Sequence, residues 1–388
     1  MKILQVSPYF YPYVGGQERY VRSLGRALVE RGHSVDVVTS NFPRTKELEV
    51  IDGMLVRRFG FFSRPLNNPL SPKLFVYLRK HYGDFDIIHC HNEHAAVTFY
   101  CSLASSQWNG PFVVTCHGQL RFDSIPKDTI ERMYSKTFAS FLLRKAARIM
   151  TISGSDRSYI ASLRIPREKI EVIPNGVELA NYDLGHCECP AEFSFDGKQV
   201  VLFVGPILKR KGPHVLIQAI PSIVKQKKDV VFVFAGRGSF KEEAQELSKE
   251  LDLENYAYFT GYVSEEKLRH LYRRSDIFCL PSFSEALSYT ILDALAFSKP
   301  VISTSIPCIT DYLAGTALLV QPGNPEELAD ALLSLLTNRK LRRDLGLKGR
   351  RLVESQFRWE SVVDRILETY HKALNNASCA CLMKTAEC

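Results

Sequence analysis

Short apolar runs alternate with amphipathic helical patterns along this chain, and this alternation constrains its fold more than any other feature. The first example is an apolar run at Ile3–Val6, a helical pattern over Gln17–Arg31 and a second apolar run at Val35–Thr39. Apolar runs that flank a helix favour parallel strands, because the helix carries the chain back to the start of the next strand. The sequence therefore predicts a doubly wound α/β fold, a parallel sheet with helices on both faces.

The alternation restarts halfway along the chain, after a stretch without periodicity at Glu178–Lys198. In a chain of 388 residues this restart predicts two domains. We expect an N-terminal domain over 1–178, a C-terminal domain over 179–358, a last helix over 359–374 that rejoins the first domain, and a flexible end over 375–388. Further strands are predicted at Leu55–Phe59, Ile87–His89, Phe112–Cys116, Arg148–Ile152, Ile170–Ile173, Val200–Val204, Val230–Ala235, Tyr256–Thr260, Ile277–Leu280 and Val301–Ser303.

The composition is that of a globular protein, with 45% hydrophobic and 24% charged residues. A net charge of +8 favours anionic partners such as phosphates or an acidic membrane surface. No nucleic-acid-binding motif accompanies that charge, so a nucleic acid is not expected as a partner. The chain starts directly with an apolar strand, shows no signal-peptide pattern and has no window apolar enough to span a bilayer. We therefore expect a cytoplasmic protein, at most peripheral on the membrane.

The cysteines and histidines do not predict a metal site. Of the ten cysteines, several lie inside apolar runs (Cys90, Cys116, Cys279) and are expected to be buried thiols in a reducing compartment. The cluster His186–Cys189 lacks a second ligand pair at zinc spacing. The histidines of the segment His89–His94 fit the end of a strand better than a metal centre. No GxGxxG follows the first strand, which counts against a nicotinamide or flavin. No cofactor and no metal are expected.

The stretch Asp276–Ala296 places acidic residues between a strand and a helix. The apolar run Ile277–Leu280 leads into a polar segment that holds Glu285, and the helical pattern beyond it carries Asp293. A strand followed by a turn and a helix directs helix N–H groups toward a ligand. Two carboxylates at that point suit sugar hydroxyls better than phosphates, so the stretch predicts the donor end of a sugar-transferring enzyme. Ser282 and Glu285 also have the spacing of a capping box, which is the structural alternative.

Two other positions follow predicted strands. His117 comes directly after an apolar strand and before a glycine, which places it at the edge of the sheet where ligands bind. A hydrogen-bonded histidine at a strand end is the simpler alternative. The basic run Lys209–Lys211 lies in a strand-to-helix loop, where anion sites form, although such a run can also be a solvated surface.

The helical pattern Thr129–Ala147 is both basic and apolar. It combines aromatic and aliphatic positions with positive charge, namely Phe138, Phe141, Leu142, Arg132, Lys136, Arg144 and Lys145. A helix of this kind can lie on an anionic membrane. An ordinary core-facing helix with a solvated basic side explains the pattern as well.

Taken in order, the landmarks of the chain resemble those of the retaining glycosyltransferases with two Rossmann-like domains, the GT-B group often called family 4. The resemblance extends to about Leu374. Its landmarks are Gly15–Glu18, His117-Gly118, Ile173–Val177, Gly205 to Gly212, Ala235–Gly238, Gly261–Val263, Glu285 with Asp293, and Leu318–Glu326. The resemblance implies two domains that face a central cleft. It also implies a nucleotide-diphosphate sugar held mostly by the C-terminal domain and an acceptor held mostly by the N-terminal one.

The resemblance implies roles for single residues, and the catalytic set it implies is His117, Glu285 and Lys211. Gly15 and Gly16 would let the backbone approach the diphosphate. Lys211 would stabilise the leaving diphosphate, and His117 would lie near the transferred sugar. Glu285 would hold the donor-sugar hydroxyls. The remaining donor-binding positions are Lys209, Arg210, Val263, Leu287, Ser288 and Asp293, of which Asp293 would meet the ribose and Leu287 and Ser288 would offer N–H groups to phosphate.

The chain departs from the family pattern at several positions. Pro206 stands where the family usually has an arginine, and Lys209 or Arg210 can replace that charge. Asp293 stands where the family has a glutamate, and Ala286 and Ser288 where it commonly has glycines. These changes leave the fold intact and bear on donor identity and activity.

The function expected from the sequence is metal-independent transfer of a sugar, with retention, from a nucleotide-diphosphate sugar to an acceptor hydroxyl. The acceptor would be a sugar, a lipid-linked molecule or another hydroxyl compound, in glycan, glycolipid or cell-surface polysaccharide synthesis. No side chain is placed as a covalent nucleophile, which favours front-side displacement assisted by the departing phosphate. The alternatives are a catalytically weakened partner subunit that binds a sugar nucleotide, and a sugar-nucleotide epimerase on the same fold.

Overall fold

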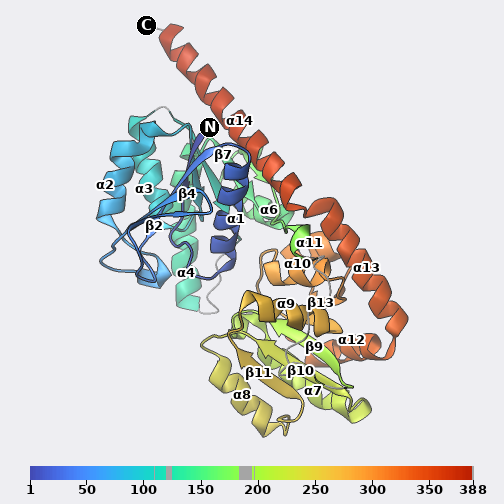
Figure 1. Cartoon of the computed structure of the whole chain (residues 1–388). Coiled ribbons are helices and arrows are strands. Elements are labelled where there is room, and N and C mark those ends of the chain that lie inside the picture. The colour runs from blue at the N-terminus through green and yellow to red at the C-terminus, as the bar shows by residue number, and fades with distance from the viewer. Residues whose placement is uncertain (109, 119–124, 183–194, 196, 387–388) are drawn as a thin grey trace. The chain divides into compact units, whose positions relative to one another are not determined.

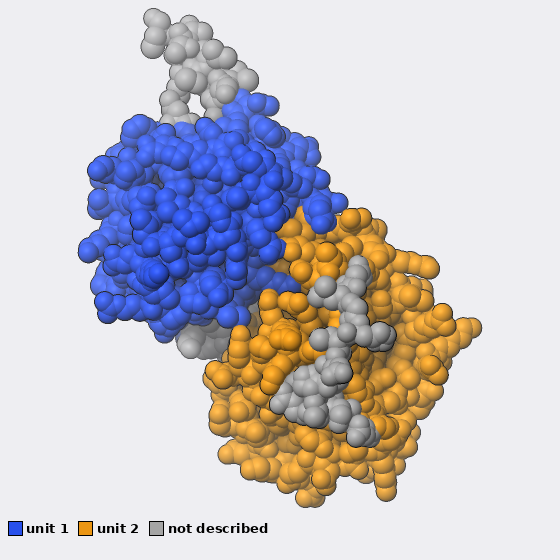
Figure 2. All heavy atoms as spheres, in the orientation of Figure 1, with its two compact units in different colours: residues 1–174, 360–388 blue, residues 175–359 orange. Residues whose placement is uncertain are grey.

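The computed structural model describes residues 1–108, 110–118, 125–182, 195 and 197–386. The chain divides into two compact units, residues 1–174 with 360–388 (unit 1) and residues 175–359 (unit 2), which Figure 2 shows in different colours. The unit boundaries lie within four residues of those expected from the sequence, and the last helix belongs to unit 1. Most of the expected linker Glu178–Lys198, and the cluster His186–Cys189 with it, lies outside the described residues.

Unit 1 is built on an eight-stranded sheet with the strand order β3-β4-β2-β1-β5-β6-β7-β8 (Figure 1). The strands are β1 Lys2–Val6, β2 Ser34–Ser40, β3 Leu48–Ile51, β4 Met54–Phe59, β5 Ile87–His91, β6 Phe112–Cys116, β7 Arg148–Thr151 and β8 Ile170–Val172. Every pair is parallel except the edge pair β3–β4. The chain runs outward from β1 in both directions, so right-handed crossovers place helices on both faces.

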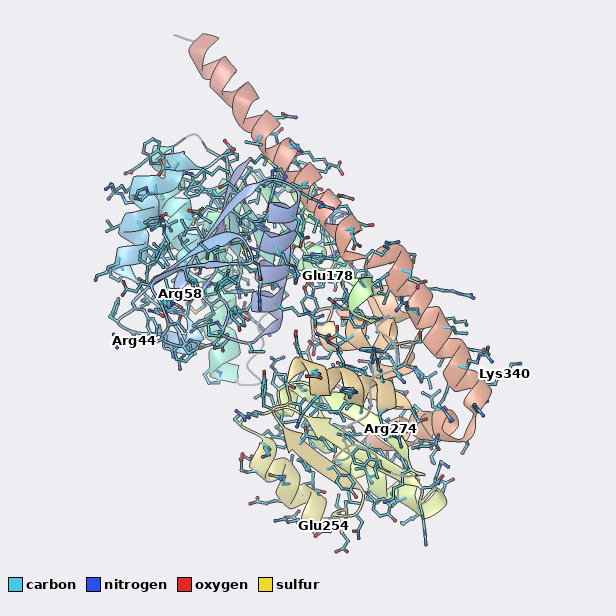
Figure 3. The ribbon with its side chains drawn as sticks, viewed as in Figure 1. Arg44, Arg58, Glu178, Glu254, Arg274 and Lys340 are labelled. Atoms are coloured by element: carbon cyan, nitrogen blue, oxygen red, sulfur yellow. The ribbon has the colours of Figure 1, made fainter. Side chains whose placement is uncertain are left out.

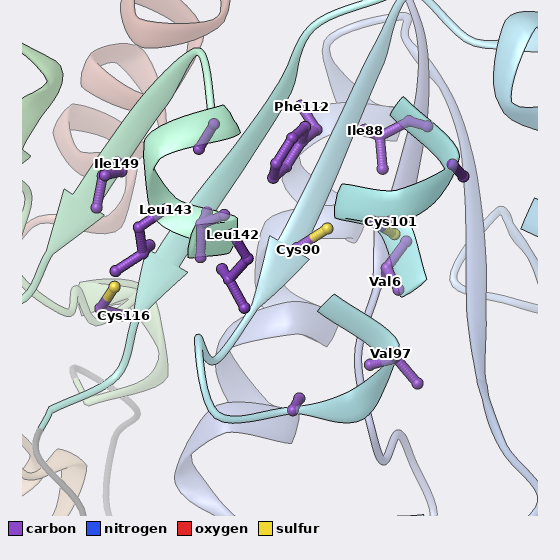
Figure 4. Close-up of a cluster of buried hydrophobic side chains, with 14 of the residues drawn as sticks. Val6, Ile88, Cys90, Val97, Cys101, Phe112, Cys116, Leu142, Leu143 and Ile149 are labelled. Atoms are coloured by element: carbon purple, nitrogen blue, oxygen red, sulfur yellow. The ribbon is translucent and has the colours of Figure 1, made fainter. Parts of the chain in front are cut away.

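The helices of unit 1 follow most of these strands. They are α1 Gly16–Glu30, α2 Pro72–His81, α3 Ala96–Ala104, α4 Ile125–Tyr134, a π-helix Ser135–Ala139, α5 Ser140–Lys145, α6 Gly154–Ser162 and α14 Trp359–Ala386. The single helix expected at Thr129–Ala147 is thus a run of three helical segments that begins earlier. Behind the sheet, aliphatic and aromatic side chains from β1, β5 and β6 pack against α3 and α5 (Figure 4).

The structure bears on the expected buried cysteines and on the expected end of the chain. Cys90 and Cys116 are buried free thiols of this core, as predicted, and Cys279 is one in unit 2. The stretch expected as a flexible end is helical as far as Ala386, because α14 continues through it. No glycine or proline follows Trp359, and alanine, leucine, methionine and lysine in this stretch all favour helix, so nothing in the sequence ends it earlier.

The edge strand β3 was not expected, because its side chains alternate between exposed and half-buried and none is fully buried. It is held by Arg58 of β4, labelled in Figure 3, which is 4% exposed and pairs with the Glu49 carboxylate. The same guanidinium donates to the Tyr11 carbonyl at 2.7 Å. Arg58 therefore connects this edge of the sheet to the loop that follows β1.

Unit 2 is built on a six-stranded parallel sheet with the order β11-β10-β9-β12-β13-β14. Its strands are β9 Gln199–Val204, β10 Val230–Ala235, β11 Ala257–Gly261, β12 Ile277–Leu280, β13 Val301–Thr304 and β14 Leu318–Val320. Its helices are α7 Pro213–Gln226, α8 Lys241–Glu250, α9 Glu265–Arg274, α10 Tyr289–Ala296, α11 Pro307–Leu313, α12 Pro325–Thr337 and α13 Arg339–Gln356. Arg274, labelled in Figure 3, donates to the carbonyls of Phe195 and Lys198 just before β9.

The predicted fold class, two doubly wound parallel-sheet α/β domains, is confirmed. In each sheet the chain reverses its direction of travel at one point, between β1 and β5 in unit 1 and between β9 and β12 in unit 2. Open α/β sheets bind ligands at the carboxyl ends of the strands beside such a point. Gly15 and Gly16 follow β1, Lys211 follows β9 and Glu285 follows β12, whereas His117 follows β6, the strand beside β5.

Candidate functional site

Lys211 and Glu285 meet as an ion pair in unit 2. Lys211 ends the 3-10 turn Lys209–Lys211 after β9, and Glu285 lies in the loop after β12. The Lys211 ammonium donates to Glu285 Oε2, and each side chain is only 9% exposed. Ser282 Oγ donates to the same oxygen at 3.2 Å. The structure thus joins two residues that the sequence separates by 74 positions.

The capping-box interpretation of Ser282 and Glu285 is wrong. Helix α10 begins at Tyr289 with Ser288 as its N-cap, so Glu285 precedes the helix. Ser282 contacts Glu285 through the two side chains, whereas a capping box would join each side chain to a backbone N–H. Glu285 therefore belongs to the loop between β12 and α10.

Gly212 lets the two loops of this site approach each other. Its φ is +72°, and a Cβ at this position would lie 2.0 Å from the Pro281 carbonyl oxygen. The Phe283 N–H donates to the Arg210 carbonyl at 2.8 Å across the same contact. Only a glycine combines the left-handed conformation with such a close backbone, and this contact keeps Lys211 beside Glu285.

The other donor-binding candidates in the loops of unit 2 are less buried than Lys211. Lys209 is exposed and Arg210 is half-buried, as is Val263 beyond the end of β11. β11 is the edge strand, two strands from β9. The Arg237 guanidinium lies 5.4 Å from the ring centre of Tyr262, next to Val263.

Asp293, one turn inside α10, has a partner that the sequence did not reveal. Its carboxylate is 6% exposed and accepts a hydrogen bond from the Tyr182 hydroxyl. At the start of the same helix, Asn175 Nδ2 donates to the Leu287 carbonyl at 2.7 Å, while Ser288 Oγ lies 2.9 Å from Thr290 Oγ1. The segment from Asn175 to Tyr182 therefore runs along α10. No local pattern could have shown this, because Tyr182 and Asp293 lie 111 positions apart.

In unit 1, His117 is half-buried beyond the end of β6 and faces other aromatic rings. Its Nε2 lies 3.2 Å from His91 Nδ1, and its ring meets Tyr20 edge to face at 5.0 Å between centroids. Burial lowers the pKa of His117 to about 4 and the pKa of His91 well below its ordinary value. Both imidazoles are therefore neutral at physiological pH.

Gly15 and Gly16 begin α1 at the carboxyl end of β1. Gly15 is the N-cap in an extended conformation, and a Cβ there would lie 2.2 Å from Glu18 Oε2. Gln17 Nε2 donates to Ser7 Oγ at 3.0 Å, which fixes the loop from β1 to the helix start. Gly15 therefore leaves room for the carboxyl group of Glu18 over the first turn.

Glu18 gives a pH-dependent prediction. Burial raises the pKa of Glu18 from 4.5 to about 7. Above pH 4.5 the unfolded chain releases this proton while the folded chain keeps it, so stability falls until the pH passes 7. We expect Glu18→Gln to stabilise the protein by about 3 kcal/mol at pH 8 and by almost nothing at pH 4. Urea unfolding at both pH values measures this.

The matched control for that measurement is Glu30→Gln on the exposed end of the same helix. A surface change of this kind is expected to stay within about 0.5 kcal/mol at either pH. An equal effect of the two substitutions, or a Glu18→Gln effect that does not grow with pH, would contradict the assignment of a raised pKa.

The three histidines from His89 to His94 have separate partners. His89 contacts Tyr370 and Thr115, each at 2.7 Å, whereas His94 lies 3.3 Å from the Glu93 carboxylate. In the part of the chain that the structure describes, no group of three or more potential ligands is placed to hold a metal ion. Over the same residues no helix is both long and apolar enough to cross a bilayer.

Comparison with known proteins relates both units to sugar-transferring enzymes. A family model described as Glycosyltransferase Family 4 matches residues 14–181, and one described as Glycosyl transferases group 1 matches residues 190–352. An uncharacterized glycosyltransferase of Methanocaldococcus jannaschii is 25% identical over 401 residues, which cover 96% of this chain and 99% of the relative. A phosphatidyl-myo-inositol mannosyltransferase of Mycobacterium leprae is 26% identical over 392 residues, with 97% and 98% covered.

A solved structure of the same architecture is HepE of Anabaena in complex with UDP-glucose. It superimposes with a TM-score of 0.77 at 19% identity, over 95% of this chain and 99% of HepE. At this level of identity the likeness concerns the fold.

Proposed function

We propose that this chain, which belongs to the group 1 and family 4 glycosyltransferases, moves a sugar from a nucleotide-diphosphate donor to an acceptor hydroxyl with retention of anomeric configuration. Its fold is that of the GT-B glycosyltransferases. The observation that carries the proposal is the buried pair of Lys211 and Glu285 at the switch point of unit 2. A cation held in place before the reaction can stabilise charge that develops on a leaving diphosphate.

Glu285 would also bind the donor sugar. In the described part of the chain, both of its hydrogen bonds, from Lys211 and Ser282, reach Oε2. Oε1 would then accept from a hydroxyl of the donor sugar. The ion pair fixes the carboxylate in one orientation, which favours positioning of the sugar over nucleophilic attack.

Asp293 and Tyr182 would meet the ribose. Asp is one methylene shorter than the glutamate of the family pattern, and the Tyr182 hydroxyl lies directly on its carboxylate. A hydroxyl that donates to the acid can still accept from a ribose hydroxyl. The N–H groups near Leu287 and Ser288 at the start of α10 would face the phosphates, with Lys209 and Arg210 contributing positive charge.

The proposed chemistry is front-side displacement. The bond from the sugar C1 to the phosphate oxygen breaks while a bond from the acceptor oxygen to C1 forms on the same face. The acceptor proton passes to the departing phosphate oxygen. No metal is required, because Lys211 and helix N–H groups supply the positive charge. The HepE complex makes UDP-glucose the first donor to test.

The test begins with thermal-shift measurements against UDP, GDP, ADP and their sugars, since a ligand that binds the folded state raises its stability. The donor that shifts the melting temperature then enters a product assay with the anomer read by NMR. We expect binding, transfer and a retained anomer. An inverted product would reject the mechanism, and the absence of binding to any nucleotide would reject the function. Binding without turnover would identify the partner-subunit alternative suggested by Pro206, and conversion of donor without acceptor would identify an epimerase.

A membrane surface is the proposed location of the acceptor, because the segment from α4 to α5 exposes an apolar stripe. Ile130, Met133, Phe138 and Phe141 are 45–66% exposed, and the neighbouring Arg132, Lys136, Arg144 and Lys145 are exposed as well, whereas Leu142 is buried in the core. Exposed apolar side chains among basic ones favour contact with anionic lipid. A lipid-linked acceptor would be reached from such a surface.

We expect Met133→Ser with Phe138→Ser to weaken binding to vesicles that contain anionic phosphatidylglycerol by at least tenfold, since each apolar side chain contributes about 1.5–3 kcal/mol when it leaves water. Sedimentation with vesicles measures this. Leu347→Ser, at an exposed apolar position on α13 of unit 2, is the control and should bind as the unmodified protein does. Equal binding by all three proteins would reject the membrane surface.

A further inference from the structure

A row of buried polar side chains runs below His117 in unit 1. Gln5 of β1 and His91 of β5 are both fully buried on neighbouring strands of the sheet. His91 Nε2 lies 2.5 Å from Gln5 Oε1, and His91 Nδ1 lies 3.2 Å from His117 Nε2. His117 is thus the half-exposed end of a three-residue chain whose other members cannot reach a ligand.

The chemistry of these groups fixes which atom donates and which accepts in each hydrogen bond between Gln5, His91 and His117. A neutral imidazole has one N–H and one lone pair, and an amide oxygen can only accept. Gln5 Oε1 therefore takes the hydrogen of His91 Nε2, which leaves His91 Nδ1 as an acceptor. His117 must then donate from Nε2, and its Nδ1 holds a lone pair.

We infer that Gln5 and His91 are positioning residues that hold His117 in the tautomer whose Nδ1 accepts a hydrogen bond from a hydroxyl of the donor sugar. The inference rests on the proposed function for the identity of the ligand. A sugar hydroxyl can donate to that lone pair, whereas a tautomer protonated on Nδ1 would donate to the hydroxyl oxygen instead. Through His91, Gln5 thereby determines whether His117 Nδ1 accepts or donates a hydrogen bond to the ligand.

His89 provides a matched control inside the same network. It is fully buried one pleat away on β5, and its ring centroid lies 4.2 Å from that of His91. Its two ring nitrogens contact Tyr370 and Thr115 and neither contacts His117. Loss of His89 removes a comparable number of buried hydrogen bonds but leaves the hydrogen bonds from Gln5 through His91 to His117 intact.

The first experiment reads the tautomer directly, from the side-chain ¹⁵N shifts of the histidine-labelled, unmodified protein. His117 is expected to show a protonated Nε2 and an unprotonated Nδ1. A protonated Nδ1 overturns the inference. This measurement needs no variant and no substrate, so it holds even where a substitution prevents folding.

The second experiment separates positioning from folding. His91→Leu, which leaves no acceptor for His117, is expected to raise the donor KM about tenfold, the effect of one lost hydrogen bond to an oriented group. His91→Gln keeps an acceptor and should restore KM. His89→Leu should leave KM unchanged, since a merely structural loss reduces the active fraction and so kcat. Equal KM values in the two His91 variants would overturn the inference, whereas absence of transfer from every donor in the unmodified protein would reject the proposed function instead.

Discussion

Lys211→Ala is expected to lower sugar transfer at least a hundredfold and to reduce the free energy of unfolding by about 3 kcal/mol. The first effect follows because no other buried cation lies beside Glu285 in the part of the chain described here. The second follows because the Glu285 carboxylate, 9% exposed, would lose its counter-charge.

Matched variants separate the two effects. Lys211→Met with Glu285→Leu removes both charges, so it should recover most of the stability and still lack transfer. Lys209→Ala, two residues away but exposed, should change the stability by less than about 0.5 kcal/mol. Chemical denaturation and a transfer assay on the same preparations provide both readings. Wild-type turnover in folded Lys211→Ala would reject the role of this lysine.

Gly212→Ala is expected to destabilise the protein by about 3 kcal/mol or more and to abolish transfer. The left-handed backbone at φ +72° costs an alanine about 1–2 kcal/mol. The added Cβ would also lie 2.0 Å from the Pro281 carbonyl oxygen, so the loops that carry Lys211 and Glu285 must separate. Overlap with a backbone atom cannot be relieved by a change of rotamer, which is why the effect exceeds that of the strained conformation alone.

Gly315→Ala is the control for Gly212→Ala. Its φ of +81° is similar, but no atom lies within 4 Å of the position of the new Cβ. It should therefore cost only the conformational part, about 1–2 kcal/mol, and leave transfer unchanged. Equal destabilisation by the two substitutions, measured by urea unfolding, would show that the approach to Pro281 has no energetic consequence.

The sequence predicted the strands that are buried on both faces, because these appear as continuous apolar runs. Val230–Ala235 and Ile277–Leu280 have the predicted bounds in the structure. β3 and β14 escaped prediction because they are edge strands of only four and three residues that remain partly exposed. The continuation of α14 to Ala386 was missed because the stretch from Asn375 onward shows no helical periodicity of apolar residues.

By itself, the sequence determined which residues stand at the ends of strands, because strand and helix periodicities are local. That was enough to select His117, Lys211 and Glu285 as candidates. Only the tertiary structure decided their partners: Glu285 for Lys211, Tyr182 for Asp293, and Gln5 through His91 for His117. Those partners lie between 26 and 111 positions apart in the chain. The order of the strands in each sheet brings them together, and no pattern within a helix or a strand records that order.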